Sequence, residues 1–354
     1  MFEKILIANR GEIAVRIIRA CRNMGIQSVA VYSKEDQNSL HTQLADQRIC
    51  IGEGPAKNNY LNMDQLITAA INTGADAIHP GYGFLSENSE FVRRCKENGI
   101  AFIGPDADVI DRMGNKSHAR KTMMDAGVPV VPGTREPVYD AETGKKLARE
   151  IGYPVIIKAS SGGGGKGMRV ATSEDEFEFE FGLAQRESAN AFGDDTMYIE
   201  RYIEKPRHVE IQIMADDFGH VVALGDRDCS VQRNHQKLIE ESPSPAINDE
   251  TRAEMNRCAI LAAKTVQYTN AGTIEFIVDP QGHFYFMEMN TRIQVEHGVT
   301  EMVTGTDLII EQIRVAAGEP LSFTEEDVKP RGHAIECRIT RKSRRRTSCR
   351  ARVW

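Results

Sequence analysis

The most informative stretch of the chain is residues 287–297, which run Met287-Glu288-Met289-Asn290-Thr291-Arg292-Ile293-Gln294-Val295-Glu296-His297. An extended strand places alternate side chains on opposite faces. One face of such a strand would carry two carboxylates, two amides and a guanidinium, from Glu288, Asn290, Arg292, Gln294 and Glu296. A strand that only needs a solvated face usually carries a looser mixture of Lys, Thr, Ser and Glu. The row therefore indicates a binding or catalytic surface, with an ordinary solvated strand as the alternative.

A β-hairpin is predicted immediately before and into this stretch. Two β-rich runs, 272–278 and 283–286, flank a Pro/Gly turn at 279–282. Their pairing would bring Glu275 within about one residue of the position opposite Glu288, with side chains roughly 5 Å apart. Two facing carboxylates repel unless they share a proton or bind a cation. With the amide oxygen of Asn290 they form a hard ligand set, so we expect Mg²⁺ (or Mn²⁺) here. No Cys and His fall at zinc-like spacing.

The second motif is a glycine-rich segment, residues 160–167 (Ser-Ser-Gly-Gly-Gly-Gly-Lys-Gly), between two strand-like runs. Backbone without side chains can approach phosphate oxygens and direct its amides at them. The segment is not a Walker A loop, because Gly167 rather than Ser or Thr follows Lys166. We predict a hairpin flap over a nucleotide, with Lys158 on the incoming strand as a fixed charge for phosphate. A flexible linker is the alternative, which the lysines and strands on both sides disfavour.

The N-terminal part begins with alternating strands and helices. Residues 4–8 read as an apolar strand, 13–24 have helical spacing, and 28–32 read as another strand. This order predicts a βαβ unit and a Rossmann-like sheet. The first turn lacks the Gly-x-Gly-x-x-Gly spacing, so no dinucleotide site is expected. The loop 79–88, which follows a predicted strand, lies where such sheets bind ligands.

Together these motifs resemble those of biotin carboxylase, the ATP-dependent component of acetyl-CoA carboxylase, which has an ATP-grasp fold. Further matching segments are 2–14, 79–88, 207–212 and 227–237, and the resemblance runs from residue 2 to about residue 339. It implies an α/β and α+β fold, with a Rossmann-like N-terminal domain before the ATP-grasp fold and an incomplete C-terminal domain. The implied parts are the N-terminal domain (1–112), a linker helix (113–130), the lid with its flap (131–204), the catalytic domain with the start of the C-terminal domain (205–339), and a basic tail (340–354).

The resemblance also implies a reaction, the ATP-dependent carboxylation of biotin on a biotin carboxyl carrier protein, with bicarbonate as reactant and carboxyphosphate as intermediate. Glu296 is the expected general base, Arg292 the bicarbonate clamp, and Arg338 the cation for the enolate-like biotin oxygen. The other implied contacts are Lys237, Gln294 and the Val295 backbone with bicarbonate, Lys237 also being catalytic; Tyr82 and Arg338 with biotin; Glu275, Glu288 and Asn290 with the metal; and Lys116, Lys158, Gly163, Gly164, Gly165, Lys166, Gly167, Glu200, His208, Gln232 and His235 with ATP. For Glu200, an ordinary half-buried strand residue is the alternative.

The composition fits a cytoplasmic enzyme. At 354 residues with 41% hydrophobic content, the chain is long enough for two or three packed domains. Its seven scattered cysteines suggest a reducing compartment, and no apolar run approaches the length of a bilayer span. We therefore expect no membrane and no nucleic acid as partner. The family implies a homodimer that works with the carrier protein and with carboxyltransferase subunits in malonyl-CoA and fatty acid synthesis.

Two features depart from the family pattern. Gly298 stands where the family usually has proline, which loosens the segment behind Glu296. The tail after Ile339 carries seven basic residues and no acid, a composition that ordinarily suggests nucleic acid or a membrane surface. Suitable codons for the tail, read one base out of register, encode a sequence that resembles the family's continuation, so we interpret the tail as a frameshift. A chain truncated in this way is expected to expose core and a strand edge and to aggregate readily.

Three alternatives stay open. The same domain begins larger enzymes, so the chain could be a fragment of a pyruvate or propionyl-CoA carboxylase. Related ATP-grasp ligases form acyl phosphates on other carboxylates, although the run 292–296 favours bicarbonate. A truncated chain could also bind nucleotide or a partner protein without turnover.

Overall fold

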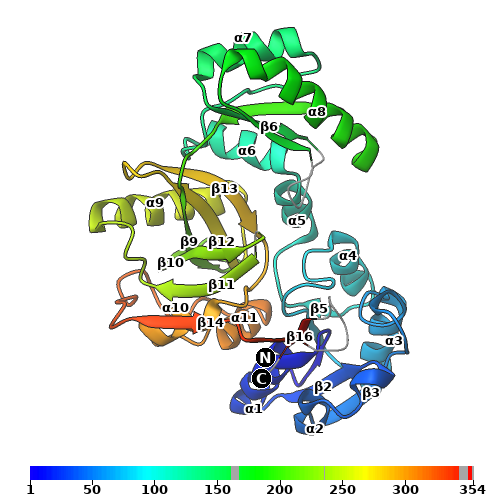
Figure 1. Ribbon diagram of the computed structural model, residues 1–354. Helices are drawn as coiled ribbons and strands as arrows, with labels where there is room; N and C mark the ends of the chain where they lie inside the picture. Colours follow the sequence, from blue (N-terminus) through cyan, green and yellow to red (C-terminus); the bar gives the residue numbers. More distant parts are fainter. Residues whose placement is uncertain (161–166, 235, 343–349, 353–354) are drawn as a thin grey trace.

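The computed structural model describes residues 1–160, 167–234, 236–342 and 350–352. Figure 1 shows three lobes: an N-terminal lobe in blue, a small lobe in green that carries α7 (Ala141–Ile151) and α8 (Glu174–Phe192), and a central lobe in yellow to orange. No helix among the described residues is both long and apolar enough to cross a bilayer. The exact domain limits given above stay a prediction.

The N-terminal lobe is built on a parallel sheet with strand order β3-β2-β1-β4-β5. Strand β1 (Lys4–Ile7) lies between β2 (Gln27–Tyr32) and β4 (Ala77–His79). Ile5, Leu6 and Ile7 are fully buried, as expected for a strand covered on both faces. The predicted βαβ opening and Rossmann-like sheet are therefore confirmed. The other elements are β3 (Gln47–Cys50), β5 (Ala101–Phe102), α1 (Gly11–Met24), α2 (Leu40–Leu44), α3 (Met63–Thr73), α4 (Ser89–Glu97), α5 (Ala107–Gly114) and 3-10 turns at Lys34–Asp36 and Ala56–Asn58.

The small lobe contains the predicted flap hairpin. It follows α6 (Lys116–Asp125), which begins where the Asn115 side chain accepts a hydrogen bond from the His118 amide. Strand β6 (Val155–Ala159) pairs antiparallel with β7 (Met168–Ala171) and β8 (Met197–Arg201). The strands on either side of the glycine-rich segment therefore form a hairpin, as predicted, whereas residues 161–166 themselves lie outside the described part of the chain.

The central lobe holds an antiparallel sheet with strand order β13-β12-β9-β10-β11-β14. The predicted hairpin is confirmed in detail, because β12 pairs with β13 so that Glu275 lies directly opposite Glu288. Helix α9 covers the sheet through a shared core that includes Met255 and Phe276. The elements are β9 (Arg207–Ala215), β10 (Val221–Arg233), β11 (Gln236–Ser242), β12 (Asn270–Val278), β13 (Phe284–Asn290), β14 (Ala334–Cys337), α9 (Asp249–Thr265), α10 (His297–Thr304) and α11 (Leu308–Ala316).

The prediction of one strand over 287–297 is wrong beyond Asn290. Strand β13 ends there, and residues 291–296 form an irregular segment that leads into α10. Glu296 has φ −76° and ψ 9°, which is not an extended conformation. Ile293 is as buried as Gln294 and Glu296, with exposures of 0%, 3% and 2%, so the segment has no solvent face and no core face. The polar side chains converge because the chain leaves the sheet and turns into a helix.

Strand β14 is the outer strand of the central sheet, and apolar side chains are exposed on it, two residues after its end and on the neighbouring strand. Ile335 and Ile339 are 60% and 68% exposed, and Ile239 on neighbouring β11 is 38% exposed. The short strands β15 (Thr340–Lys342) and β16 (Arg350–Arg352) pair with each other. An exposed apolar strand at a sheet edge favours association with another chain.

We therefore expect the double variant Ile335→Lys, Ile339→Lys to lower concentration-dependent self-association, because it places two charges on this edge. Light scattering over a concentration series measures the effect. Met302→Lys is the matched control, since Met302 is 81% exposed but lies on α10. Equal association of both variants and the unaltered chain would contradict the prediction.

Candidate active site

Lys237 lies at the centre of a cluster of carboxylates in the central lobe. Its Nζ atom lies 2.5 Å from Glu210, 2.9 Å from Glu275 and 2.7 Å from Glu296. Burial opposes the charge of this ammonium, but Glu210 and Glu275 outweigh that effect and raise the pKa of Lys237 above its ordinary value. Lys237 therefore stays charged and offsets three acidic side chains. The structure places it beside Glu296, and the catalytic roles of both residues stay predictions.

Glu275 is an ionised carboxylate surrounded by donors. Burial alone would raise its pKa, yet the hydrogen bond from His208 and the charge of Lys237 hold the pKa well below its ordinary value. Its Oε1 atom also accepts from Asn290 at 2.8 Å and from Gln294 at 3.0 Å. Two of the three predicted metal ligands, Glu275 and Asn290, are therefore in direct contact.

Glu288, the third predicted ligand, is opposite Glu275 in register, but its carboxylate pairs with Lys116 at 2.8 Å. The ligand atoms of His208, Glu210 and Glu275 also lie within 4.8 Å of one another. That inner set suits a metal less well, because Glu210 is already bound by two cationic side chains, Arg227 and Lys237. The oxygen atoms of Glu275, Glu288 and Asn290 fit the preference of Mg²⁺ for hard ligands and could hold it.

Arg227 contacts the cluster through Glu210 and Gln294. The side chain is completely buried, and all its donor nitrogens are used. Nε donates to Glu210 at 2.6 Å, while the terminal nitrogens donate to Gln212 (2.7 Å), Thr300 (3.0 Å), Thr273 (3.1 Å) and Gln294 (2.9 Å). Arg227 thereby fixes Gln294, a predicted bicarbonate contact. The sequence placed Arg227 only within a family motif, since residue type alone does not distinguish a buried arginine from a surface one.

Arg292, the predicted bicarbonate clamp, is held by the N-terminal lobe. Its Nε donates to one oxygen of Glu87 at 2.8 Å, and the other oxygen accepts from the Thr291 amide at 3.2 Å. Arg292 also donates to Oδ1 of Asn290 at 3.1 Å. Glu87 belongs to the loop 79–88, so that loop does reach the site. The sequence motif that contains Glu87 predicted no individual role for it.

Arg338 joins the cluster from the segment after β14. A terminal nitrogen donates to Oε2 of Glu296 at 2.7 Å, and Nε lies 2.7 Å from Oε1 of Glu240. Glu296 is 2% exposed and therefore lies between two cations, Lys237 and Arg338. The structure thus brings together the predicted base and two predicted catalytic cations, from three segments far apart in the sequence.

The predicted nucleotide contacts are divided between the small and central lobes. Lys158 pairs with Glu200 at 2.5 Å, and Arg120 lies 3.2 Å from the same carboxylate, which favours a structural role for the Glu200 side chain. His208 accepts from Gln232 at 2.8 Å. A Cβ on Gly167 would lie 2.8 Å from Cβ of Ala159, so only glycine fits at the base of the flap. Gly163, Gly164, Gly165, Lys166 and His235 lie outside the described residues.

Tyr82, the predicted biotin contact, is buried in the loop 79–88 with 7% exposure. Asn9 fixes this loop by donating to the backbone oxygens of Pro80 and Tyr82, at 2.7 and 2.8 Å. The Tyr82 hydroxyl has no hydrogen-bond partner among the described residues. A buried hydroxyl without a partner can bind a ligand, which is compatible with the predicted contact with biotin. That contact stays a prediction.

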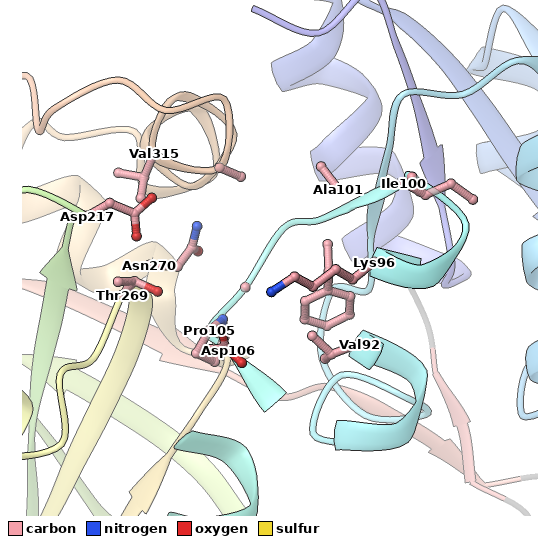
Figure 2. A pocket seen from close by; sticks show the side chains of 14 residues that line it. Val92, Lys96, Ile100, Ala101, Pro105, Asp106, Asp217, Thr269, Asn270 and Val315 are labelled. Atoms are coloured by element: carbon pink, nitrogen blue, oxygen red, sulfur yellow. The ribbon is translucent and has the colours of Figure 1, made fainter. Parts of the chain in front are cut away.

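A cavity of about 390 Å³ lies between the N-terminal and central lobes (Figure 2). Figure 2 shows Lys96 of α4 on one side and Asp217 and Asn270 of the central lobe on the other. None of the predicted site residues lines this cavity. We therefore place the chemistry at the buried cluster around Lys237 and not in the cavity.

The glycine at 298 affects the helix that follows the proposed base. Gly298 lies in the first turn of α10, and a Cβ there would meet only Glu336 Oε2, at an ordinary 3.6 Å. We expect Gly298→Ala to raise the free energy of unfolding by about 0.5–1 kcal/mol, because glycine costs about this much in a helix. Thermal or urea unfolding measures it.

Gly305→Ala is the matched control at the other end of α10. Gly305 has φ +74°, a conformation that costs other residues about 1–2 kcal/mol, although no neighbour would meet its Cβ within 4 Å. This variant is expected to be destabilised. A loss of stability in Gly298→Ala would show that the first turn of α10 requires glycine.

Comparisons with known proteins agree with this geometry. Residues 1–110 match the family model described as biotin carboxylase, N-terminal domain, and residues 115–324 match carbamoyl-phosphate synthase L chain, ATP binding domain. The biotin carboxylase of Nostoc sp. is 58% identical over 338 residues, which are 96% of this chain and 76% of that protein. A pyruvate carboxylase subunit of Methanothermobacter thermautotrophicus is 54% identical over 96% of this chain, and the match covers 69% of its length.

Solved structures give the same result. The Campylobacter jejuni biotin carboxylase, described as a β-γ-ATP complex, superposes with a TM-score of 0.90 at 51% identity, over 96% of this chain and 76% of that one. The biotin carboxylase domain of a Hydrogenobacter thermophilus 2-oxoglutarate carboxylase superposes with a TM-score of 0.87 at 49% identity, over 96% and 75% of the two chains. That structure is described as a dimer in complex with MgADP, ADP and bicarbonate.

Proposed function

Because the chain belongs to the biotin carboxylase family of ATP-dependent ligases, we propose that it carboxylates biotin with bicarbonate at the expense of ATP. The observation that carries the proposal is the convergence on Glu296 of Lys237 and Arg338, each at 2.7 Å. A proton acceptor between two fixed cations suits an anionic reactant that must first lose a proton.

In the first step, an oxygen of bicarbonate attacks the γ-phosphorus of ATP and the bond to ADP breaks. Glu296 accepts the proton that bicarbonate loses. Arg292 binds two bicarbonate oxygens, while Gln294, fixed by Arg227, and the Val295 amide orient the anion. Lys237 neutralises the charge that spreads over the reacting groups.

The nucleotide is bound by the side chains that line both lobes. Lys116 and Lys158 contact phosphate oxygens, and the role of residues 161–166 as a flap stays a prediction. Bound Mg²⁺ or Mn²⁺, held by Glu275, Glu288 and Asn290, would supply further neutralisation of the phosphoryl oxygens. The Glu200 segment lies along adenine, and His208, Gln232 and His235 are further nucleotide contacts.

In the second step, carboxyphosphate breaks down to carbon dioxide and phosphate, and the phosphate removes the proton of a biotin ureido nitrogen. That nitrogen then attacks carbon dioxide. Arg338 stabilises the negative charge on the ureido oxygen, because it can exchange its contact with Glu296 for one with the substrate. Tyr82 lines the biotin position.

We assign the reaction to acetyl-CoA carboxylase, with biotin on a carrier protein as acceptor and carboxyltransferase subunits as further partners. The proposed assembly is a homodimer, and the proposed location is the cytoplasm. Two relatives named biotin carboxylase, at 58% identity, support this choice; a second Bacillus subtilis biotin carboxylase and the pyruvate carboxylase relative are both 54% identical. Coupled assays with carboxyltransferases for acetyl-CoA and for pyruvate test it. Product from pyruvate alone would favour the second pathway.

The salt bridge between Glu87 and Arg292 is expected to orient the bicarbonate clamp. Glu87→Ala should raise the KM for bicarbonate about five- to tenfold. This effect lies between that of losing an exposed ion pair and that of losing a buried charged hydrogen bond, because the Glu87 side chain is 40% exposed. The KM for ATP should stay unchanged. Steady-state kinetics measure both constants, and an unaltered KM for bicarbonate would rule out this role.

The transfer of oxygen from bicarbonate to phosphate tests the proposed reaction most specifically. Attack of bicarbonate on ATP places one bicarbonate oxygen in the released phosphate. With ¹⁸O-bicarbonate we therefore expect one labelled oxygen per phosphate, detected by mass spectrometry. Unlabelled phosphate, released at the same rate, would mean that water and not bicarbonate attacks ATP.

A further inference from the structure

Beyond the residues of the proposed reaction, a second pair of carboxyl groups faces Arg338. Glu240 on β11 and Glu336 on β14 are directly opposite each other in the antiparallel register. Glu240 is completely buried, and its Oε1 lies 2.7 Å from Nε of Arg338. Neither oxygen of Glu240, nor Nε of Arg338, makes a hydrogen bond among the described residues, so the 2.7 Å contact is an ion pair. A buried carboxylate normally has its lone pairs satisfied, so this group is unusual for a purely structural acid.

The geometry divides the guanidinium of Arg338 between two carboxylates. Nε points to Glu240, and a terminal nitrogen points to Glu296. In the proposed second step the terminal nitrogens must turn to the substrate. Glu240 binds the nitrogen that the substrate does not need, so it can hold Arg338 in place while the contact with Glu296 is exchanged.

The surroundings of the pair are dominated by negative charge. The charged groups that face it among the described residues are Arg338, Glu296 from the segment before α10, Lys237 on β11 and Glu12 on α1. From α10, which packs against β14, His297 and Glu301 face each other at 4.0 Å. Burial and Glu296 raise the pKa of Glu240 to about 6 against the opposing effect of Arg338, and burial and Glu240 raise the pKa of Glu336 to about 7.

We propose that Glu240 is a positioning residue for Arg338 and that Glu240 and Glu336 share one proton near neutral pH, which limits the negative charge beside the substrate. The inference rests on the proposed function for its kinetic consequence only. Two adjacent carboxyl groups that cannot both ionise are expected to hold one proton between them. With that proton present, Arg338 keeps enough positive potential to attract an anionic oxygen.

The kinetic test is Glu240→Gln, which keeps the shape of the side chain and removes its charge. We expect the KM for biotin to rise at least about tenfold, because the guanidinium of Arg338 loses the buried ion pair that orients it, while the KM for ATP changes less than twofold. Glu241→Gln is the matched control, because Glu241 is the next residue on β11 and pairs with His333 at 2.9 Å. An unchanged KM for biotin in Glu240→Gln would overturn the positioning role.

The proton is tested by stability, which does not depend on activity. A carboxyl group whose pKa is raised on folding destabilises the fold as pH rises from the unfolded pKa of about 4.5 to the folded pKa of about 7. We compare the folding equilibrium constant of the unaltered chain with that of Glu336→Gln at each pH. The quotient of the two constants should fall at least about tenfold between pH 5 and pH 7.5. Glu241→Gln should show no such trend. If the unaltered chain and Glu336→Gln lose or gain stability in parallel between pH 5 and pH 7.5, the shared proton is overturned.

The two readouts separate the inference from the proposed function. If the unaltered chain shows no biotin-dependent turnover, the proposed function fails, while the stability series still decides whether the pair holds a proton. If turnover is present and only the Glu240→Gln and Glu336→Gln effects are missing, the inference fails alone.

Discussion

Replacing Glu296 by glutamine is expected to lower bicarbonate-dependent ATP cleavage by about 10²–10⁴-fold, the contribution typical of a general base. Glutamine fills the same space between Lys237 and Arg338 but cannot accept a proton. Phosphate release measured with saturating ATP and bicarbonate gives the effect on kcat. Because the hydrogen-bond partners of Glu296 among the described residues, Lys237 and Arg338, are not predicted ATP contacts, the affinity for ATP should change little.

Two controls make this result specific. Glu254→Gln removes a carboxylate from α9, where Glu254 pairs with Arg257 on the surface, and should leave turnover unchanged. Titration with ATP shows whether the Glu296→Gln chain still folds and binds nucleotide. A variant with normal nucleotide affinity and normal turnover would remove Glu296 from the mechanism and leave its cations without a reactive partner.

Replacing Arg227 by methionine is expected to lower the free energy of unfolding by about 3–5 kcal/mol, because breaking a buried ion pair leaves an uncompensated charge. Glu210 would retain only Lys237, and four neutral side chains would lose their donor. Arg227→Lys should lose less stability, since the charge remains although the planar fork is lost. Urea unfolding, monitored by circular dichroism, measures both.

Arg257→Met is the matched control, because Arg257 is an exposed arginine in a surface ion pair on α9. Its stability should not be distinguishable from that of the unaltered chain. If Arg227→Met is no less stable than Arg257→Met, the network beneath the carboxylate cluster does not stabilise the fold.

The sequence predicted the elements that are governed by local rules. The hairpin with Glu275 opposite Glu288 follows from two β-rich runs and a Pro/Gly turn, and the structure has this register. The parallel N-terminal sheet follows from the continuously apolar strand at 4–8 and the helix that ends before Gly25. Such patterns depend on neighbours in sequence, so they can be interpreted without the fold.

What the sequence did not show depends on contacts between distant segments. The strand prediction for 287–297 failed after Asn290 because the burial of Ile293 and the start of α10 override a period-two pattern. Glu87 and Arg227 had no predicted role, since their importance comes from partners 205 and 67 positions away, respectively. The same holds for Glu240, whose neighbour Glu336 is fixed only by the pairing of β11 with β14.

The most direct test of the central claim is phosphate release from ATP by the purified chain, with Mg²⁺ and bicarbonate, in the presence and absence of free biotin and beside Glu296→Gln. Biotin carboxylation predicts turnover that biotin stimulates and that the Glu296→Gln variant loses. A soluble chain that binds ATP but releases no phosphate under any of these conditions would contradict the account, because the nucleotide site would then be preserved without catalysis.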